Sequence, residues 1–413
     1  MVEGNPSKDL PVGRRVAYWR SRRNLTQQSF ADRLGKSKSW VEKIERGARA
    51  LDRFSVLQEI AAVLRIDVGQ LLDGEADPAA AGGRHAGRLD LEALRAVLER
   101  YAPAAGPPDE SPSPSRLRQA VDHAWLTFQH GGYDTLTRLL PKLLAEAQAA
   151  DAYHGSSDDD GPAVAHLLAQ VYQVASSTLR KLGAYDSAWL AADRAMAVAA
   201  RCGDPLLAGV AACRTGNALL ALGRPRTALE LHLTFANRLA PAVADADPDR
   251  LSVHGALLLQ AAMAAARLGD NATVADLLRE AERSAALLGA DENRYWTSFG
   301  PTNVELHRAA AEVELGEGGR AVEVHDAIDP LRFAALLPER RAQHLLDVAR
   351  GYGQYGDAEN AGRMLLAGER LAPAEIRHRP DAHQLVAEIV RRSRGRPPAS
   401  VADLARRMRI NAI

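Results

Sequence analysis

The stretch LTQQSFADRLGKSKSWVEKIERG, residues 25–47, carries the strongest local pattern in this chain of 413 residues. Thr26 and Ser37 each precede a short segment of helical periodicity, and both are residue types that cap the amino terminus of a helix. Gly35 separates the two segments and allows the left-handed turn that ends a helix. The pattern predicts two short helices joined by a tight glycine turn. Their inward faces carry Phe30, Ala31, Leu34, Val41 and Ile44.

Helical patterns continue on both sides of this stretch. Val12, Val16 and Trp19 place an apolar stripe on a first helix, and two further helical segments follow before residue 74. Residues 1–74 are therefore predicted to form a domain of five helices. This domain holds 14 basic and 9 acidic residues in a chain that is neutral overall. A small basic domain attached to a mildly acidic remainder favours a polyanionic partner for the small domain.

The rest of the chain is predicted to be helical as well. Residues 75–115 form a linker rich in small residues, proline and serine, with a short helix at 89–101. Residues 116–395 show helical periodicity almost throughout, and 396–413 form a short tail helix. Aromatic residues make up only 5% of the chain, and runs of β-branched residues are few. We therefore expect an all-α protein.

The long region repeats a pattern in which a glycine follows a helical stretch, at intervals of 40 to 52 residues. Its sharpest copy, GNALLALGRPRTALELH (216–232), resembles the tetratricopeptide consensus. The repeats predict an α-solenoid of about six helix pairs, with a concave surface that binds a peptide, a small molecule or a partner helix. A plain scaffold or a dimerisation platform is the alternative. The glycines are Gly131, Gly183, Gly223, Gly269, Gly316 and Gly356.

Residues 11–74 are similar to the lambda-repressor/Cro-like, or Xre-type, DNA-binding domain. The resemblance implies double-stranded DNA as a partner, bound by a homodimer on a near-palindromic operator. It also implies that Arg20 and Glu45 pair with each other to hold the fold. The matching motif elements are Arg20, Thr26-Gln27, Ala31, Leu34-Gly35, Ser37, Val41, Glu45 and Gly47.

The same resemblance assigns DNA contacts to individual residues. Lys38, Ser39 and Lys43 match positions that reach base edges in the major groove. Trp40 is expected either to touch a thymine methyl or sugar or to belong to the core. The other expected contacts, mainly to the phosphate backbone, are Gln27, Ser37, Arg46, Arg49, Arg53 and Arg15.

Five polar residues fall on the expected inner faces of the repeats. Amide side chains both donate and accept hydrogen bonds, and arginines can bind a carboxylate at two points, so either suits a peptide or small-molecule effector. Contacts within the fold are the alternative for each of them. An aromatic cluster at 295–301 either walls a pocket or fills a junction between helices. The five candidate ligand contacts are Gln173, Asn217, Arg267, Asn303 and Arg350.

Sequence motifs for catalysis are missing. The G-x-G-x-x-G spelling at 351–356 lies at the end of a predicted helix and not after a strand, so it does not indicate a nucleotide site. The histidines and the two cysteines have no metal-ligand spacing. We expect no cofactor, no metal and no enzymatic activity. An absent apolar span and an absent secretory signal favour a cytoplasmic protein without membrane contact.

An Xre-type head joined to helical repeats resembles peptide-pheromone receptors of Gram-positive bacteria and regulators of actinobacterial type. This combination implies a dimeric, sequence-specific transcriptional regulator whose repeat domain senses a ligand. The alternative is an adaptor in which the repeats grip a partner protein and the amino-terminal domain only anchors it to DNA.

Overall fold

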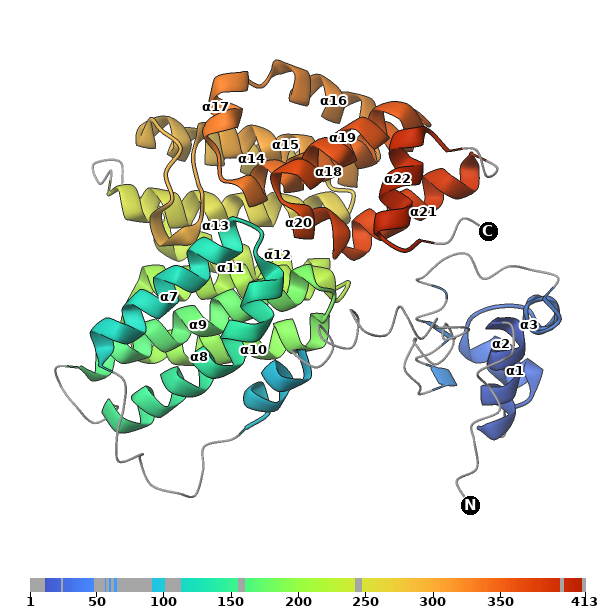
Figure 1. The fold of residues 1–413 in the computed structure, drawn as a ribbon, viewed down its shortest axis with the longest axis horizontal. Helices are drawn as coiled ribbons and strands as arrows, with labels where there is room; N and C mark the ends of the chain where they lie inside the picture. The colour runs from blue at the N-terminus through green and yellow to red at the C-terminus, as the bar shows by residue number, and fades with distance from the viewer. Residues whose placement is uncertain are drawn as a thin grey trace. The chain divides into compact units, whose positions relative to one another are not determined.

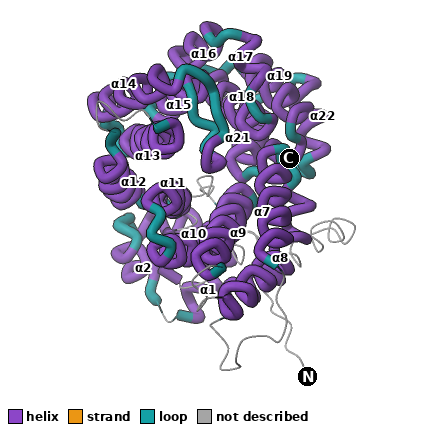
Figure 2. Tube along the Cα trace, turned by 90° about the vertical axis from the view of Figure 1, so that its left-hand side faces the viewer, coloured by secondary structure: helices purple, strands orange, loops and turns teal. Residues whose placement is uncertain are grey.

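The computed structural model divides the chain into two compact units, residues 1–86 and 87–413. All regular elements among the described residues are helices, and Figure 2 draws this part of the chain as helices joined by loops. This observation confirms the prediction of an all-α protein. The described residues are 12–23, 25–47, 56, 59–60, 63–64, 91–100, 113–154, 160–241, 247–393 and 397–410.

The amino-terminal unit contains α1 (Val12–Arg22), α2 (Gln27–Arg33) and α3 (Lys38–Glu45) (Figure 1). The Thr26 hydroxyl accepts a hydrogen bond from the Ser29 amide at 3.1 Å and so caps α2. The two helices predicted from residues 25–47 are thus confirmed. Their apolar faces close over a small core of Val16, Phe30, Ala31, Val41, Ile60 and Leu64.

The connection between α2 and α3 follows the predicted chemistry. Gly35 has a φ of 62°, which is the left-handed conformation that favours glycine. The Ser37 hydroxyl accepts a hydrogen bond from the Trp40 amide at 3.2 Å and caps α3. Residues 56, 59–60 and 63–64 are helical, as expected for the fourth helix. The fifth expected helix, at 66–74, lies outside the described residues.

The second unit is a row of antiparallel helix pairs, of which six match the six predicted repeats (Figure 1). The first helices of these pairs pack against one another, and each second helix of the first five pairs also packs against the first helix of the next pair. The pairs are α7 (Pro114–Gln129) with α8 (Tyr133–His154), α9 (Gly161–Lys181) with α10 (Tyr185–Arg201), α11 (Pro205–Ala221) with α12 (Pro225–Leu239), α13 (Pro248–Arg267) with α14 (Asn271–Leu288), α15 (Pro301–Glu314) with α16 (Gly318–Ala327), and α18 (Pro338–Gln354) with α19 (Ala358–Leu371).

Shorter elements join or follow these pairs. The predicted tail helix is α22 (Ala399–Arg407), which packs on α21 (Pro380–Arg392) and on α19, so it closes the end of the row. Two short helices, η1 (Arg294–Trp296) and α17 (Pro330–Ala335), lie in connections between pairs, and α20 (Pro373–Arg377) joins the sixth pair to α21.

The short helix expected at 89–101 spans residues 91–98 in the structure. Leu94, Val97 and Leu98 are buried in the same core as α7 to α10. The Arg95 guanidinium donates to the Ser187 hydroxyl of α10 at 3.0 Å. This helix therefore belongs to the repeat unit, whereas the sequence placed it in a linker.

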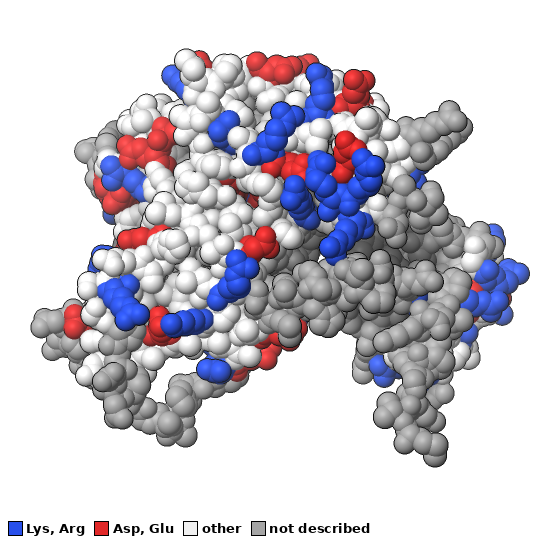
Figure 3. Space-filling view, viewed as in Figure 1, with Lys and Arg blue, Asp and Glu red and all other residues white. Residues whose placement is uncertain are grey.

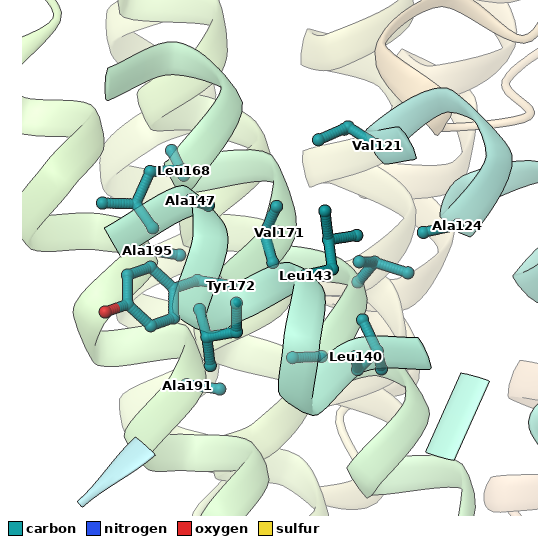
Figure 4. Close-up of a cluster of buried hydrophobic side chains, with 14 of the residues drawn as sticks. Val121, Ala124, Leu140, Leu143, Ala147, Leu168, Val171, Tyr172, Ala191 and Ala195 are labelled. Carbon is teal, nitrogen blue, oxygen red and sulfur yellow. The ribbon is translucent and has the colours of Figure 1, made fainter. Parts of the chain in front are cut away.

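The repeat glycines lie where the sequence predicted them, between the two helices of each pair. All six have φ between 72° and 88°, a conformation that costs other residues free energy. Small residues also bring the helices close together, and Figure 4 shows alanines of α8 and α10 beside larger side chains of α9. The labelled residues of α8, α9 and α10 are Leu140, Leu143, Ala147, Leu168, Val171, Tyr172, Ala191 and Ala195.

The pair α11–α12 shows the closest approach of this kind. A Cβ added to Gly216 would lie 2.0 Å from Nε2 of His232, which is fully buried on α12. Only glycine leaves room for that ring. Burial also lowers the pKa of His232 to about 4, so the imidazole is neutral at pH 7.

The first and last parts of the repeat unit meet through a buried ionic cluster. Lys181, at the end of α9, places its ammonium 2.5 Å from a carboxylate oxygen of Glu339 on α18 and 2.5 Å from one of Glu375 on α20. Arg379 also donates to Glu375, at 2.8 Å, and the Tyr133 hydroxyl of α8 donates to the same carboxylate. The cluster joins α8 and α9 to α18 and α20, and Figure 2 shows the row of pairs curving back on itself.

Gly216→Ala is expected to lower the free energy of unfolding by about 1–3 kcal/mol, because the added methyl group overpacks the contact with His232. Gly319→Ala is the matched control, since nothing lies within 4 Å of a Cβ at that position of α16. Urea denaturation of both variants measures the difference. Equal stabilities would contradict the close approach of α11 and α12.

Lys181→Ala is expected to cost about 3–5 kcal/mol, because it leaves two buried carboxylates without their ammonium partner. Lys142→Ala is the control, since that side chain is 78% exposed and pairs only with Glu146 on its own helix. Thermal and urea unfolding of the two variants give the comparison. A Lys181→Ala protein as stable as the control would show that the cluster does not hold the unit closed.

The stability of the repeat unit is expected to fall as the pH drops from 6.5 to 4. Burial lowers the pKa of His232 to about 4 and that of His307 to about 3, below the value of about 6.5 in an unfolded chain. Between these values the unfolded state binds more protons, so acid favours unfolding. Urea midpoints across this range measure the effect. His232→Gln should flatten the dependence, whereas His123→Gln, an exposed control on α7, should leave it unchanged.

A second loss of stability is expected between about pH 4.5 and 2. Burial by itself would raise the pKa of Glu339, but the Lys181 ammonium and the Arg340 guanidinium hold it at about 2. Since the folded pKa lies below the unfolded one, the contribution is full above pH 4.5 and disappears as the carboxylate is protonated. Glu339→Gln should reduce this acid-dependent step in the same titration.

Candidate functional site

Helix α3 presents one polar face to solvent. Ser39 and Lys43 are exposed, while Val41 and Ile44 on the opposite side are buried in the core. Lys38 is also exposed and lies 3.7 Å from Glu42 one turn later, which is a weak pair at the surface. The three residues expected to reach base edges thus share an accessible surface.

The orientation of α3 is fixed by the pair that the resemblance implied. Arg20 of α1 binds Glu45 at two points, with Nε 2.6 Å from Oε1 and a terminal nitrogen 3.1 Å from Oε2. Arg20 also donates to the Leu25 carbonyl oxygen at 2.6 Å. Because Glu45 is only 5% exposed, this two-point pair is largely shielded from water and ties the end of α3 to α1.

Gln27 and Trp40 are tied to the fold as well. Gln27, the first residue of α2, donates from its amide nitrogen to the Glu45 carboxylate at 2.8 Å, so this bond joins the start of α2 to the end of α3. Trp40 is half-buried and packs against the small core, which favours the core alternative for its ring. Ser37 caps α3 with its hydroxyl and remains exposed. The DNA contacts of these three residues stay predictions.

The remaining basic residues that were expected to contact DNA differ in their exposure to solvent. Arg46 is exposed at the end of α3, where its Nε donates to the Glu42 carbonyl oxygen at 3.3 Å. Arg15 is only 3% exposed, and its burial argues against the expected phosphate contact. The reason is visible in the sequence, since Arg15 precedes Trp19 by one helical turn and so borders the apolar stripe. Arg49 and Arg53 lie outside the described residues.

The described part of the amino-terminal unit is strongly basic. Residues 12–47 contain ten lysines and arginines against three acidic residues, and one of the acidic residues, Glu45, is bound to Arg20. Figure 3 shows basic side chains on the visible face of this unit, whereas both signs are interspersed over much of the repeat unit. A polyanion is the kind of partner that such a surface attracts.

The candidate ligand contacts on the repeats fall into two groups. Gln173 and Asn303 are 1% and 3% exposed, and neither the amide nitrogen of Gln173 nor the amide oxygen of Asn303 has a hydrogen-bond partner among the described residues. Arg267 and Arg350 both bind Glu314, at 3.3 and 2.9 Å, so the fold itself compensates their charge. Asn217 is half-buried on α11.

The aromatic segment at 295–301 fills the junction between repeats, which is the second of its two expected roles. The Trp296 ring stacks on Trp125 of α7 at 5.8 Å, with 11° between the ring planes. Tyr295, Trp296 and Ser298 have φ of 50°, 57° and 50°, a left-handed conformation that costs non-glycine residues about 1–2 kcal/mol each. The contacts of this segment must therefore contribute more free energy than the strained backbone conformation costs.

No helix among the described residues is both long and apolar enough to cross a membrane. No group of three or more histidine, cysteine, aspartate or glutamate side chains there is arranged to hold a metal ion.

Comparison with known proteins decides the nature of the amino-terminal unit. Residues 11–73 match the family described as a helix-turn-helix domain. This chain carries a helix-turn-helix domain. Helix α2 is the first helix of the helix-turn-helix motif, and α3 is the second helix.

The chain is also similar to a curated protein. The chain is 29% identical over 92 residues to the HTH-type transcriptional regulator SlrR of Bacillus subtilis (strain 168), an overlap of 22% of this chain and 60% of that regulator. Among solved structures, PlcR of Bacillus thuringiensis in complex with the peptide PapR7 and DNA shares 14% identity with a TM-score of 0.28. That match covers 67% of this chain and 95% of the PlcR chain.

Proposed function

We propose that this protein is a sequence-specific DNA-binding transcriptional regulator. The observation that carries the proposal is the outward face of α3, where Lys38, Ser39 and Lys43 are exposed while Arg20 and Glu45 fix the helix from behind. The second helix of such a motif lies in the major groove with its side chains toward base edges. Lysine suits the paired acceptors of guanine, and serine accepts or donates according to the base.

The regulator acts as a homodimer on a near-palindromic operator. One helix-turn-helix domain covers a single half-site, and two copies one helical turn apart, about 34 Å, give the affinity and specificity that one copy lacks. The repeat unit is the natural source of the dimer contact, because a row of helix pairs offers a long continuous surface.

The repeat unit senses a ligand and passes its binding to the DNA-binding domains. Gln173 and Asn303 support this role, because buried amide atoms without partners are costly unless something bonds to them. We assign no catalytic role to the protein, in keeping with the regulatory class of the matched sequence. The adaptor alternative requires a stoichiometric protein partner on the repeats.

Gel shifts with the full-length protein and fragments of its own promoter region test the proposal. The expected result is binding to one fragment that weakens steeply as salt rises, since phosphate contacts release counterions. Sedimentation equilibrium at the same protein concentrations should show a dimer. Equal affinity for all fragments, or no binding at low salt, would overturn the proposal.

Lys43→Ala is expected to weaken operator binding by about 1–3 kcal/mol and to reduce the preference for the operator over unrelated DNA. Arg46→Ala is the matched comparison, because Arg46 lies just past the recognition surface and is expected to meet phosphate. It should weaken all sequences alike and flatten the salt dependence. Titrations of operator and scrambled DNA at two salt concentrations separate the two effects. Identical behaviour of the two variants would refute this division of roles.

A further inference from the structure

Trp296 makes the kinds of contact with the repeat unit that a bound ligand makes with a protein. Its ring stacks on Trp125, its indole nitrogen donates to Oε1 of Gln170 at 3.0 Å, and its backbone carbonyl oxygen accepts a hydrogen bond from Arg214 at 3.2 Å. The Arg214 guanidinium also lies 5.2 Å from the centre of the Trp125 ring. The ring face, the ring N–H and the neighbouring carbonyl group each have a dedicated partner.

These partners belong to the first helices of three consecutive pairs. Trp125 lies on α7, Gln170 on α9 and Arg214 on α11, which are neighbours in the unit (Figure 1). Trp125 is fully buried, and its own indole nitrogen has no hydrogen-bond partner among the described residues. The first helices are the surface on which solenoid repeats bind their ligands.

The segment that delivers Trp296 is anchored on one side and distorted at its tip. Phe299 is fully buried against α13, where a Cβ on Gly255 would lie 1.9 Å from its ring. On the other side, Asn293 exchanges two amide hydrogen bonds with Gln129 of α7, at 2.9 and 3.0 Å. Between these anchors, Tyr295, Trp296 and Ser298 hold the left-handed backbone conformation. Displacement of residues 294–298 would therefore relieve the backbone strain while the contacts of Asn293 and Phe299 remain.

We propose that Trp125, Gln170 and Arg214 form an effector site for a planar ring bearing an N–H group and an adjacent carbonyl, which the protein's own Trp296 occupies in this state. An effector of this class binds by displacing residues 294–298. The proposal rests on the proposed function, in which the repeat unit senses a ligand, and it names the chemical class of that ligand. Indole derivatives and tryptophan-containing peptides share this chemistry.

Displacement of residues 294–298 would break contacts with several repeats at once. The Tyr295 hydroxyl donates to Asp204 at the start of α11, and Arg294 pairs with Asp249 of α13 at 2.8 Å. Together with Trp296, these residues link the second, third and fourth pairs to the first. An effector that takes the place of Trp296 keeps the contacts to α7, α9 and α11 but loses the link to α13.

Trp296→Ala empties the site and tests it directly. Full-length Trp296→Ala protein, checked for folding by circular dichroism, is titrated calorimetrically in the absence of DNA with indole-3-acetamide and, separately, with N-acetyl-Gly-Trp-Gly-amide. At least one probe is expected to bind with one-to-one stoichiometry and to raise the melting temperature. The tighter of the two probes shows whether a free small molecule or a peptide is the better source of the ring. Trp189→Ala, which removes a partly exposed tryptophan on α10, is the control and should gain no site.

Two further comparisons make the assignment specific. Adding Gln170→Ala to Trp296→Ala should weaken the tighter probe at least tenfold, since the ring N–H loses its acceptor. Wild-type protein should bind at least tenfold more weakly than Trp296→Ala, because Trp296 competes for the site. Saturating probe should then speed hydrogen exchange of residues 294–298 in the wild type.

Three results would overturn the inference. They are no binding of either probe to folded Trp296→Ala protein, equal binding with and without Gln170, and unchanged hydrogen exchange in probe-saturated wild type. Should Trp296→Ala fail to fold, Trp296→Phe replaces it, because that ring keeps the stacking but lacks the N–H that binds Gln170, and it must bind probe more tightly than wild type. Gel shifts without probe report separately on DNA binding, so failure here leaves the proposed regulator intact.

Discussion

A buried ammonium group decides how the repeat unit closes. Lys181 ends α9 inside the protein, 2% exposed, and an isolated charge at such a place would cost several kcal/mol. Glu339 and Glu375 make its burial tolerable, and they come from α18 and α20. The six helix pairs must therefore curve enough to bring the sixth pair back to the first two. An open superhelix of the same pairs would leave these three charges apart.

Contacts between neighbouring first helices also decide what the inner residues do. The sequence predicts that Arg267 and Arg350 meet the carboxylate of a ligand. Here both bind Glu314, so their guanidinium groups hold α13, α15 and α18 together. By contrast, the amide nitrogen of Gln173 and the amide oxygen of Asn303 have no hydrogen-bond partner among the described residues, and Gln170 binds the Trp296 ring that stacks on Trp125.

In the helix-turn-helix domain, the contacts that fix α3 lie behind its exposed face. Arg20 and Glu45 form a two-point pair that binds α1 to the end of α3, and Gln27 adds a third contact from the start of α2. These contacts keep α3, which carries the exposed side chains of Ser39 and Lys43, from rotating. A fixed helix of this kind suits precise recognition, which requires side chains held within a fraction of an ångström.

The helix caps, the turn glycines and the repeat count can be predicted from the order of the amino acids, because each of these depends on residues within one or two helical turns. Thr26, Ser37 and Gly223 each act on a backbone a few positions away, and their types reveal that role. The burial of Arg15 follows from helical spacing too, since it borders the apolar stripe of α1. By contrast, the folded arrangement of the helices is needed to see that Lys181 meets carboxylates 158 and 194 residues further along, and that Trp296 stacks on Trp125. Such pairings depend on the summed curvature of six helix pairs, and no local pattern in the chain encodes that sum.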